Sequence, residues 1–162
     1  MKTLMNLLLT AMLTITATGQ DRFAASIKTE PKAYKDGLNI GFGLMYQNNF
    51  FYAEASAFLF PDLNGASYED VGGSFGLNWR DRFLNWRVYG GYKAAAIFRA
   101  GNGGYALMGF EAGAEYYLKG ESPGPFIGIG YYGVNRSDPK FWSPNDDSKR
   151  YNNGIIKMGW RW

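Results

Sequence analysis

The residue types that most often carry catalysis or bind metal are scarce in this chain of 162 residues, which contains no histidine and no cysteine. Hydrolases of the serine–histidine type need an imidazole to accept the serine proton near neutral pH. Zinc sites are built mostly from histidine and cysteine. The sequence therefore predicts a protein that is not an enzyme and that has no cofactor and no metal site.

Two acidic residues are the remaining candidates for catalysis by carboxylates. Glu111 and Glu115 are four residues apart, so on one face of a strand they are separated by roughly 13 Å. That separation is too large for the carboxyl pair of a glycosidase on one strand. We expect both carboxylates to pair with cations instead.

A glycine-rich motif, G-x-G-x-x-G, occupies residues 128–133. In dinucleotide-binding folds this motif opens a helix whose N-terminus holds the pyrophosphate. The residues that follow, V-N-R-S-D-P, do not start a helix. We interpret the motif as a strand whose glycines leave room for neighbouring rings or inward side chains.

The elements that must position these residues are strands. Aromatic residues make up 18% of the chain and charged residues 19%, the latter below the usual share of about 25%. Apolar and polar residues alternate along eight stretches separated by turn residues. The stretches are 22–30, 38–47, 50–60, 68–79, 84–98, 105–119, 126–135 and 151–162. A polar loop is expected at 61–67, a glycine-rich turn at 101–104 and a long loop at 136–150.

The last stretch has the most distinctive pattern. Met158, Trp160 and Trp162 share one face, and Lys157 and Arg161 share the other. It resembles the closing strand of bacterial outer-membrane β-barrels, in which a terminal aromatic residue is part of the signal read by the barrel assembly machinery. The resemblance implies that Met158, Trp160 and Trp162 form this C-terminal assembly signal.

The beginning of the chain looks like a secretory signal peptide over residues 1–19. Lys2 precedes a short apolar run, and Ala17 and Gly19 place small residues before an expected cleavage site at Gln20. The apolar run is too short to cross a membrane as a helix. Residues 20–162 then form one domain.

These features together resemble small eight-stranded bacterial outer-membrane barrels such as OmpX and the transmembrane domain of OmpA. The resemblance implies an all-β fold, an antiparallel up-and-down transmembrane barrel after a cleaved signal peptide, in the outer membrane of a Gram-negative bacterium. Such barrels have short periplasmic turns, longer extracellular loops and both termini in the periplasm. The expected partners are outer-membrane lipid, lipopolysaccharide and the assembly machinery, and the expected state is a monomer.

Alternation alone leaves two alternatives to a closed membrane barrel. One is a soluble, secreted, lipocalin-like barrel that binds a small apolar ligand inside, and the other is a narrow passive channel. The polar face is rich in small residues and carries charges of both signs, so it is a poor surface for contact with water. A barrel with this face inside and its apolar face in lipid is therefore favoured. We expect these charges to pair in an acidic lumen. They are Glu54, Arg87, Lys93, Glu111, Glu115, Lys157 and Arg161.

Aromatic residues near the strand ends also favour a membrane barrel. Aromatic rings that keep one edge in contact with water are favoured at the membrane interface, so two girdles of aromatic residues are expected, one at each interface. Their members are Tyr46, Phe50, Phe51, Phe60, Tyr68, Trp79, Phe83, Trp86, Phe98, Tyr105, Tyr116, Phe126, Trp160 and Trp162.

The long loop before the last stretch is the best candidate for a contact surface. Exposed aromatic residues of this kind bind proteins or glycans, so a surface protein, a glycan or a phage is the expected partner. The contact residues are Lys140, Phe141, Trp142, Asp146 and Asp147, and phosphates of lipopolysaccharide are expected at Arg136, Lys140, Lys149 and Arg150. A nearly balanced charge, with 17 basic and 14 acidic residues, argues against nucleic acid. The predicted function is that of a non-enzymatic outer-membrane barrel, structural or interacting with the surroundings through its extracellular loops.

Overall fold

A computed structural model describes residues 22–32, 38–63, 66–81, 85–99, 102–120, 122–138 and 150–162. In these ranges no helix has the length and apolar character needed to cross a membrane. The segment expected to be a signal peptide, 1–19, lies outside the described residues.

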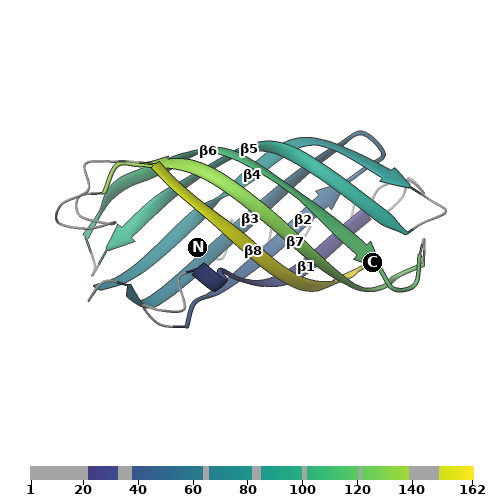
Figure 1. Ribbon diagram of the computed structural model, residues 1–162, viewed down its shortest axis with the longest axis horizontal. Coiled ribbons are helices and arrows are strands. Elements are labelled where there is room, and N and C mark those ends of the chain that lie inside the picture. The colour runs from purple at the N-terminus through teal and green to yellow at the C-terminus, as the bar shows by residue number, and fades with distance from the viewer. Residues whose placement is uncertain are drawn as a thin grey trace, which may run out of the picture.

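Eight antiparallel strands form a closed barrel in which each strand pairs with its neighbours in the sequence, as predicted (Figure 1). The last strand closes on the first, with Trp160 opposite Ala25, and the Trp162 N–H donates to the Phe23 carbonyl over 2.9 Å. The strands are β1 (Arg22–Thr29), β2 (Ile40–Gln47), β3 (Phe51–Leu63), β4 (Ala66–Asp81), β5 (Trp86–Arg99), β6 (Asn102–Tyr117), β7 (Gly124–Arg136) and β8 (Arg150–Arg161).

Two expected connections are wrong because the strands are longer than the alternation indicated. The expected loop at 61–67 belongs largely to β3 and β4, which still pair at Leu63 and Ala66. Pro61 is tolerated there because the register shifts between Phe60 and Leu63, where the ladder is interrupted. The expected turn at 101–104 is shorter as well, because β6 already begins at Asn102. The hairpins β3–β4 and β5–β6 therefore extend the wall at the end away from the termini.

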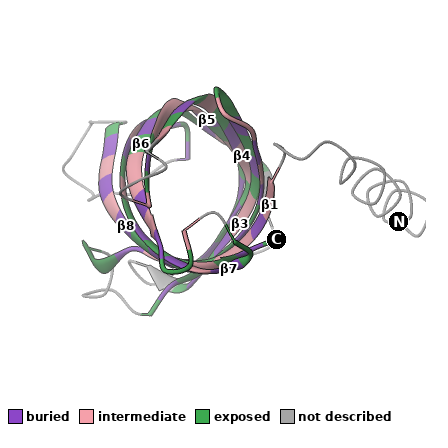
Figure 2. Cartoon of the chain, turned by 90° about the vertical axis from the view of Figure 1, so that its right-hand side faces the viewer, coloured by how far each residue is buried: buried purple, intermediate pink, exposed green. Residues whose placement is uncertain are grey.

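Exposure along the strands shows which face is outside. Figure 2 shows buried and exposed residues alternating along the strands of the barrel. Among the described residues, 25 large hydrophobic side chains are exposed, whereas only 14 hydrophobic residues are buried. Charged residues are rarely buried in water-soluble proteins unless they are paired, yet many are buried here. The barrel is therefore inside-out relative to a soluble one.

The outward face of the described wall is free of charge over a broad band. On β4, for example, no charged side chain points outward between Val71 and Trp79, and Glu69 lies just beyond this band. Nine residues span about 26 Å along a strand, or about 20 Å along the membrane normal at a tilt of about 40°, which covers most of the apolar band of about 25 Å in outer-membrane barrels. This wall is suited to lipid along its whole circumference.

The expected aromatic girdles are only partly present. Phe60, Tyr68 and Phe126 point into the barrel, because each lies at an even spacing from an inward residue of its strand. Outward rings do gather at the end that carries the termini, where Trp86 and Tyr116 pack with ring centroids 5.1 Å apart. Phe83 lies outside the described residues.

Candidate functional site

The lumen of the barrel holds the polar chemistry of this protein. Twelve charged residues of the described chain are buried, six cations and six anions. The expectation of an acidic lumen is therefore wrong, because the buried charges balance. The cations are Lys28, Arg87, Lys93, Arg136, Lys157 and Arg161, and the anions are Glu30, Glu54, Asp70, Glu111, Glu115 and Asp138.

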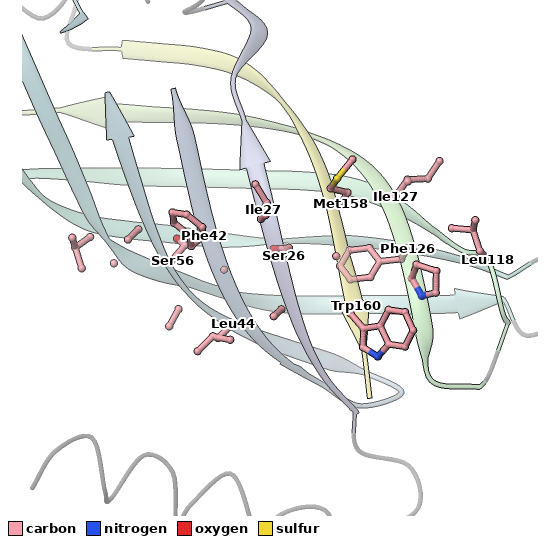
Figure 3. A pocket seen from close by; sticks show the side chains of 18 residues that line it. Ser26, Ile27, Phe42, Leu44, Ser56, Leu118, Phe126, Ile127, Met158 and Trp160 are labelled. Carbon is pink, nitrogen blue, oxygen red and sulfur yellow. The ribbon is translucent and has the colours of Figure 1, made fainter. Parts of the chain in front are cut away.

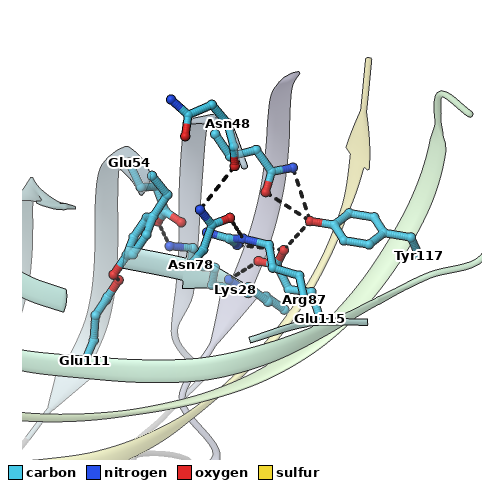
Figure 4. A network of polar contacts seen from close by, with 11 residues as sticks. Lys28, Asn48, Glu54, Asn78, Arg87, Glu111, Glu115 and Tyr117 are labelled. Atoms are coloured by element: carbon cyan, nitrogen blue, oxygen red, sulfur yellow. Dashed lines mark hydrogen bonds and ion pairs between the residues drawn. The ribbon is translucent and has the colours of Figure 1, made fainter. Parts of the chain in front are cut away.

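Glu115 is the centre of an ionic cluster in the lumen (Figure 4). Its Oε2 atom accepts a hydrogen bond from Arg87 Nη1 over 2.8 Å and another from the Tyr117 hydroxyl over 2.6 Å. Lys157 forms an ion pair with its other oxygen, Oε1. Glu115 and Arg87 are completely buried, so the carboxylate is held by two cations and is their shared counter-charge.

Two glycines make room for these ion pairs. A Cβ added at Gly128 would lie 3.0 Å from both Glu115 Cγ and Lys157 Cε, so the bare backbone lets the two side chains meet across β7. Gly43 does the same between Lys28 and Glu54, since a Cβ there would lie 2.9 Å from each. The expected role of glycine in the 128–133 motif, which lies within β7, is thereby confirmed.

The Arg87 guanidinium is also held by its neighbours on either side. Its Nε donates to Asn78 Oδ1 over 2.9 Å. Its Cζ lies 5.0 Å from the ring centroid of Tyr52 and 4.7 Å from that of Tyr89, which are cation–π distances. Charge, hydrogen bonding and packing thus fix a single position for this side chain.

A second polar layer lies beside the first. Lys28 forms an ion pair with Glu54, and the Tyr52 hydroxyl donates to Glu111 Oε1 over 2.9 Å. Lys93 Nζ lies between two rings, 5.8 Å from the centroid of Phe58 and 5.6 Å from that of Tyr132. The structure therefore places Lys93 against aromatic faces in the lumen.

An apolar cluster fills the lumen toward the end away from the termini. Its buried members are Phe58, Phe60, Tyr68, Ile97, Leu107, Tyr132, Val134, Tyr151 and Ile155. Glu30 is buried beside this cluster and accepts hydrogen bonds from the Tyr151 hydroxyl (2.8 Å), from Asn153 Nδ2 (2.7 Å) and from the Tyr132 hydroxyl. The lumen at the end away from the termini is thus packed like a protein core.

Arg136 closes the same end of the lumen. Its guanidinium donates to both oxygens of Asp70, over 2.8 and 3.2 Å, and to Asp138 Oδ1 over 3.0 Å. The side chain is 2% exposed, so the expectation that Arg136 meets lipopolysaccharide phosphates is wrong. The alternation of β7 continues to this position, which makes it inward.

The opposite mouth is covered by the turn between β6 and β7. The Gly120 carbonyl accepts a hydrogen bond from Arg80 Nη2 over 3.1 Å and another from Arg161 Nη2, which also donates to the Ser122 carbonyl over 3.1 Å. Arg161 Cζ lies 4.0 Å from the ring centroid of Tyr117. The penultimate residue of the chain thereby ties the last strand to this turn.

Several lumen residues were not among the predicted ones. Lys28, Glu30 and Asp70 lie within the predicted stretches 22–30 and 68–79, at an even spacing from other inward residues, so the alternation alone was enough to find them. Asp138 lies beyond the last residue of β7, in the expected loop, so only the tertiary structure reveals its burial.

The two carboxylates that were candidates for catalysis both have partners in the lumen. The carboxylates of Glu111 and Glu115 are occupied by hydrogen bonds or ion pairs inside a filled barrel. In the described ranges, no group of three or more His, Cys, Asp or Glu residues is placed to hold a metal ion. The expected contact residues Lys140, Phe141, Trp142, Asp146 and Asp147 lie outside the described residues, as does Lys149.

The three residues of the expected assembly signal lie on the outer face of β8. Met158, Trp160 and Trp162 are 61%, 45% and 55% exposed. Their recognition by the assembly machinery remains a prediction.

Deletion of Trp162 is expected to lower the amount of folded barrel in the membrane several-fold. It removes the terminal aromatic and the backbone bond to Phe23 that helps to close the barrel. Heat-modifiable gel mobility of the membrane fraction measures the folded amount. The matched control is Trp79→Ala, which removes an exposed tryptophan from β4. Equal folded amounts for the deletion and the wild type would contradict the role of the last residue.

Comparison with known proteins defines a class rather than a family. No protein-family model matches the sequence, and no curated protein matches it. The closed, eight-stranded, next-neighbour topology is that of small outer-membrane barrels. The crystal structure of Neisserial surface protein A (NspA) has this fold and matches with a TM-score of 0.52 and 11% sequence identity, over 89% of this chain and 96% of that chain. At this identity the likeness concerns the fold.

Proposed function

We propose that this protein is a non-enzymatic, integral outer-membrane barrel that displays the ends of its long hairpins at the cell surface. The observation that carries the proposal is the inside-out wall, which exposes 25 large hydrophobic side chains of the described chain and buries twelve charged ones. In lipid, strands must also pair without a free edge, and the closure of β8 on β1 supplies this pairing.

The same observation argues against the two alternatives. A lipocalin-like barrel turns its apolar face inward, whereas here the lumen contains ion pairs and the wall is apolar. A passive channel needs an open path along the barrel axis. This lumen is occupied by the Glu115 cluster, the Glu30 cluster and a nine-residue apolar core, and both mouths are crossed by arginine contacts.

The surface role is supported by the shape of the barrel. Strands β3 to β6 have 13 to 16 residues, whereas β1 and β2 have 8. The extra length raises the β3–β4 and β5–β6 hairpins above the apolar band at the end away from the termini. We propose that this end, together with Phe141 and Trp142 of the loop between β7 and β8, binds a surface protein, a glycan or a phage.

Single cysteines can test this placement, because the natural chain has none. Ser67 is exposed on the β3–β4 hairpin, and Ser122 is exposed in the turn between β6 and β7. In intact cells, Ser67→Cys is expected to react with a polyethylene-glycol maleimide too large to cross the outer membrane. Ser122→Cys is the matched control and is expected to react only after the outer membrane is permeabilised.

Other labelling patterns would contradict the proposal. A soluble periplasmic protein would leave both cysteines unlabelled in intact cells, and the reverse pattern would invert the topology. Heat-modifiable mobility of both variants shows that each barrel has folded before the labelling is compared.

A further inference from the structure

A groove of about 940 Å³ crosses the outer wall of the barrel (Figure 3). Its floor is the backbone of one register row that runs across six strands. The row consists of Phe126, Gly159, Ser26, Gly43, Ser56 and Gly72. The rows on either side form the walls, in which Ala25, Ala55 and Ala57 alternate with bulky residues such as Leu44 and Trp160.

The path of this groove matches one leaflet of a bilayer. Five spacings of about 4.8 Å between neighbouring strands give a length of about 24 Å. Strands of such barrels tilt by about 40°, so a row perpendicular to them rises by about 15 Å, slightly more than half of the apolar band of about 25 Å. The groove starts near the ends of β7 and β8 at Trp160 and ends in the middle of β4 at Gly72. It therefore leads from the rim that carries the termini to the bilayer midplane.

A lysine lies at the rim end of the groove. Lys119 is exposed, follows the groove residue Leu118, and has its Nζ atom 5.9 Å from the ring centroid of Trp160, a wall residue. Lysine and tryptophan at a membrane interface are suited to a lipid headgroup. The groove itself is lined almost entirely by apolar atoms. Lys119 therefore lies at one end of an apolar groove that rises by about the thickness of one leaflet.

We propose that this groove binds an anionic phospholipid of the periplasmic leaflet, with its phosphate at Lys119 and an acyl chain along the register row. The volume lies at the upper end of the range for ligand sites, roughly 300–1,000 Å³, as a lipid requires. The inference rests on the proposed membrane placement. The labelling of Ser67→Cys tests that placement independently, so a barrel that labels as expected but shows no lipid preference overturns this inference alone.

Native mass spectrometry of the full protein released from detergent tests the headgroup preference. Phosphatidylglycerol is expected to be retained about five-fold more than phosphatidylcholine with the same acyl chains, the factor that corresponds to about 1 kcal/mol per cation near anionic lipid. Lys119→Gln is expected to abolish the preference. The control is Lys32→Gln, which changes an exposed lysine at the other end of the barrel and is expected to keep it. Equal retention of the two lipids by the wild type, or an unchanged preference in Lys119→Gln, overturns the proposal.

A second pair of variants tests the groove. Ala57→Phe places a ring in its path, whereas Ala112→Phe places the same ring on the outward face of β6, away from it. Retention of phosphatidylglycerol is expected to fall several-fold for Ala57→Phe and to stay at the wild-type level for Ala112→Phe. Heat-modifiable mobility confirms that both variants fold. Equal retention by the two variants would show that lipid binds elsewhere on the wall.

Discussion

Replacing Glu115 with glutamine is expected to lower the free energy of unfolding by about 3–5 kcal/mol, because it leaves two buried cations without their shared counter-charge. Arg87 and Lys157 are both almost completely buried and both form ion pairs with this carboxylate. Glutamine keeps the size of the side chain, so the loss reports charge and not a cavity. The change also weakens the bond that the Tyr117 hydroxyl donates.

Urea unfolding of the barrel in lipid vesicles, followed by tryptophan fluorescence, measures this change. The control is Glu69→Gln, which neutralises an exposed carboxylate on the outer face of β4 and is expected to change stability by less than about 0.5 kcal/mol. A variant that also carries Arg87→Met and Lys157→Met removes the uncompensated cations and is expected to recover much of the loss. If Glu115→Gln behaves like the control, the ionic cluster does not hold the lumen together.

Phe75→Lys is expected to destabilise the inserted barrel by about 2–4 kcal/mol, the cost of lysine near the bilayer midplane on the lipid face. Phe75 lies halfway between Val71 and Trp79 on the charge-free band of β4 and is 64% exposed. If the outward face of β4 lay in water instead, the same change would cost little, because the new charge would be hydrated. The variant therefore tests whether this outward face lies in lipid.

The matched change is Phe50→Lys, which alters an even more exposed phenylalanine in the turn between β2 and β3. Near the interface the expected cost is only about 0–1 kcal/mol. The same unfolding measurement in vesicles compares the two variants. Equal effects of the two lysines would contradict the depth that the structure gives to Phe75.

Alternation of residue types was sufficient to predict most of the fold. It located all eight strands and identified the outward residues of β2 and β3. On β8 it placed Lys157 and Arg161 on one face and Trp160 on the other. It failed at the strand ends, at 61–67 and 101–104, because turn residues such as Pro61 and Gly103 also occur inside strands where a bulge or a hairpin end accommodates them.

The candidate site was predictable only as a set of inward residues. Period-two spacing tells which side chains share a face, but it carries no information about the register in which two strands pair. Lys28 and Glu54 were both on inward faces, yet their pairing depends on the register of β1, β2 and β3 and on the missing side chain of Gly43.

The sequence by itself determined that eight strands each have an apolar face and a polar face, and that His- and Cys-dependent chemistry is excluded. Local side-chain geometry is enough for this, since neighbouring residues of a strand point to opposite faces. Only the tertiary structure decided that the buried charges of the described lumen balance, that Arg136 is buried and that one register row forms a lipid-sized groove. These properties depend on contacts between strands far apart in the chain, which strand register and barrel closure set together.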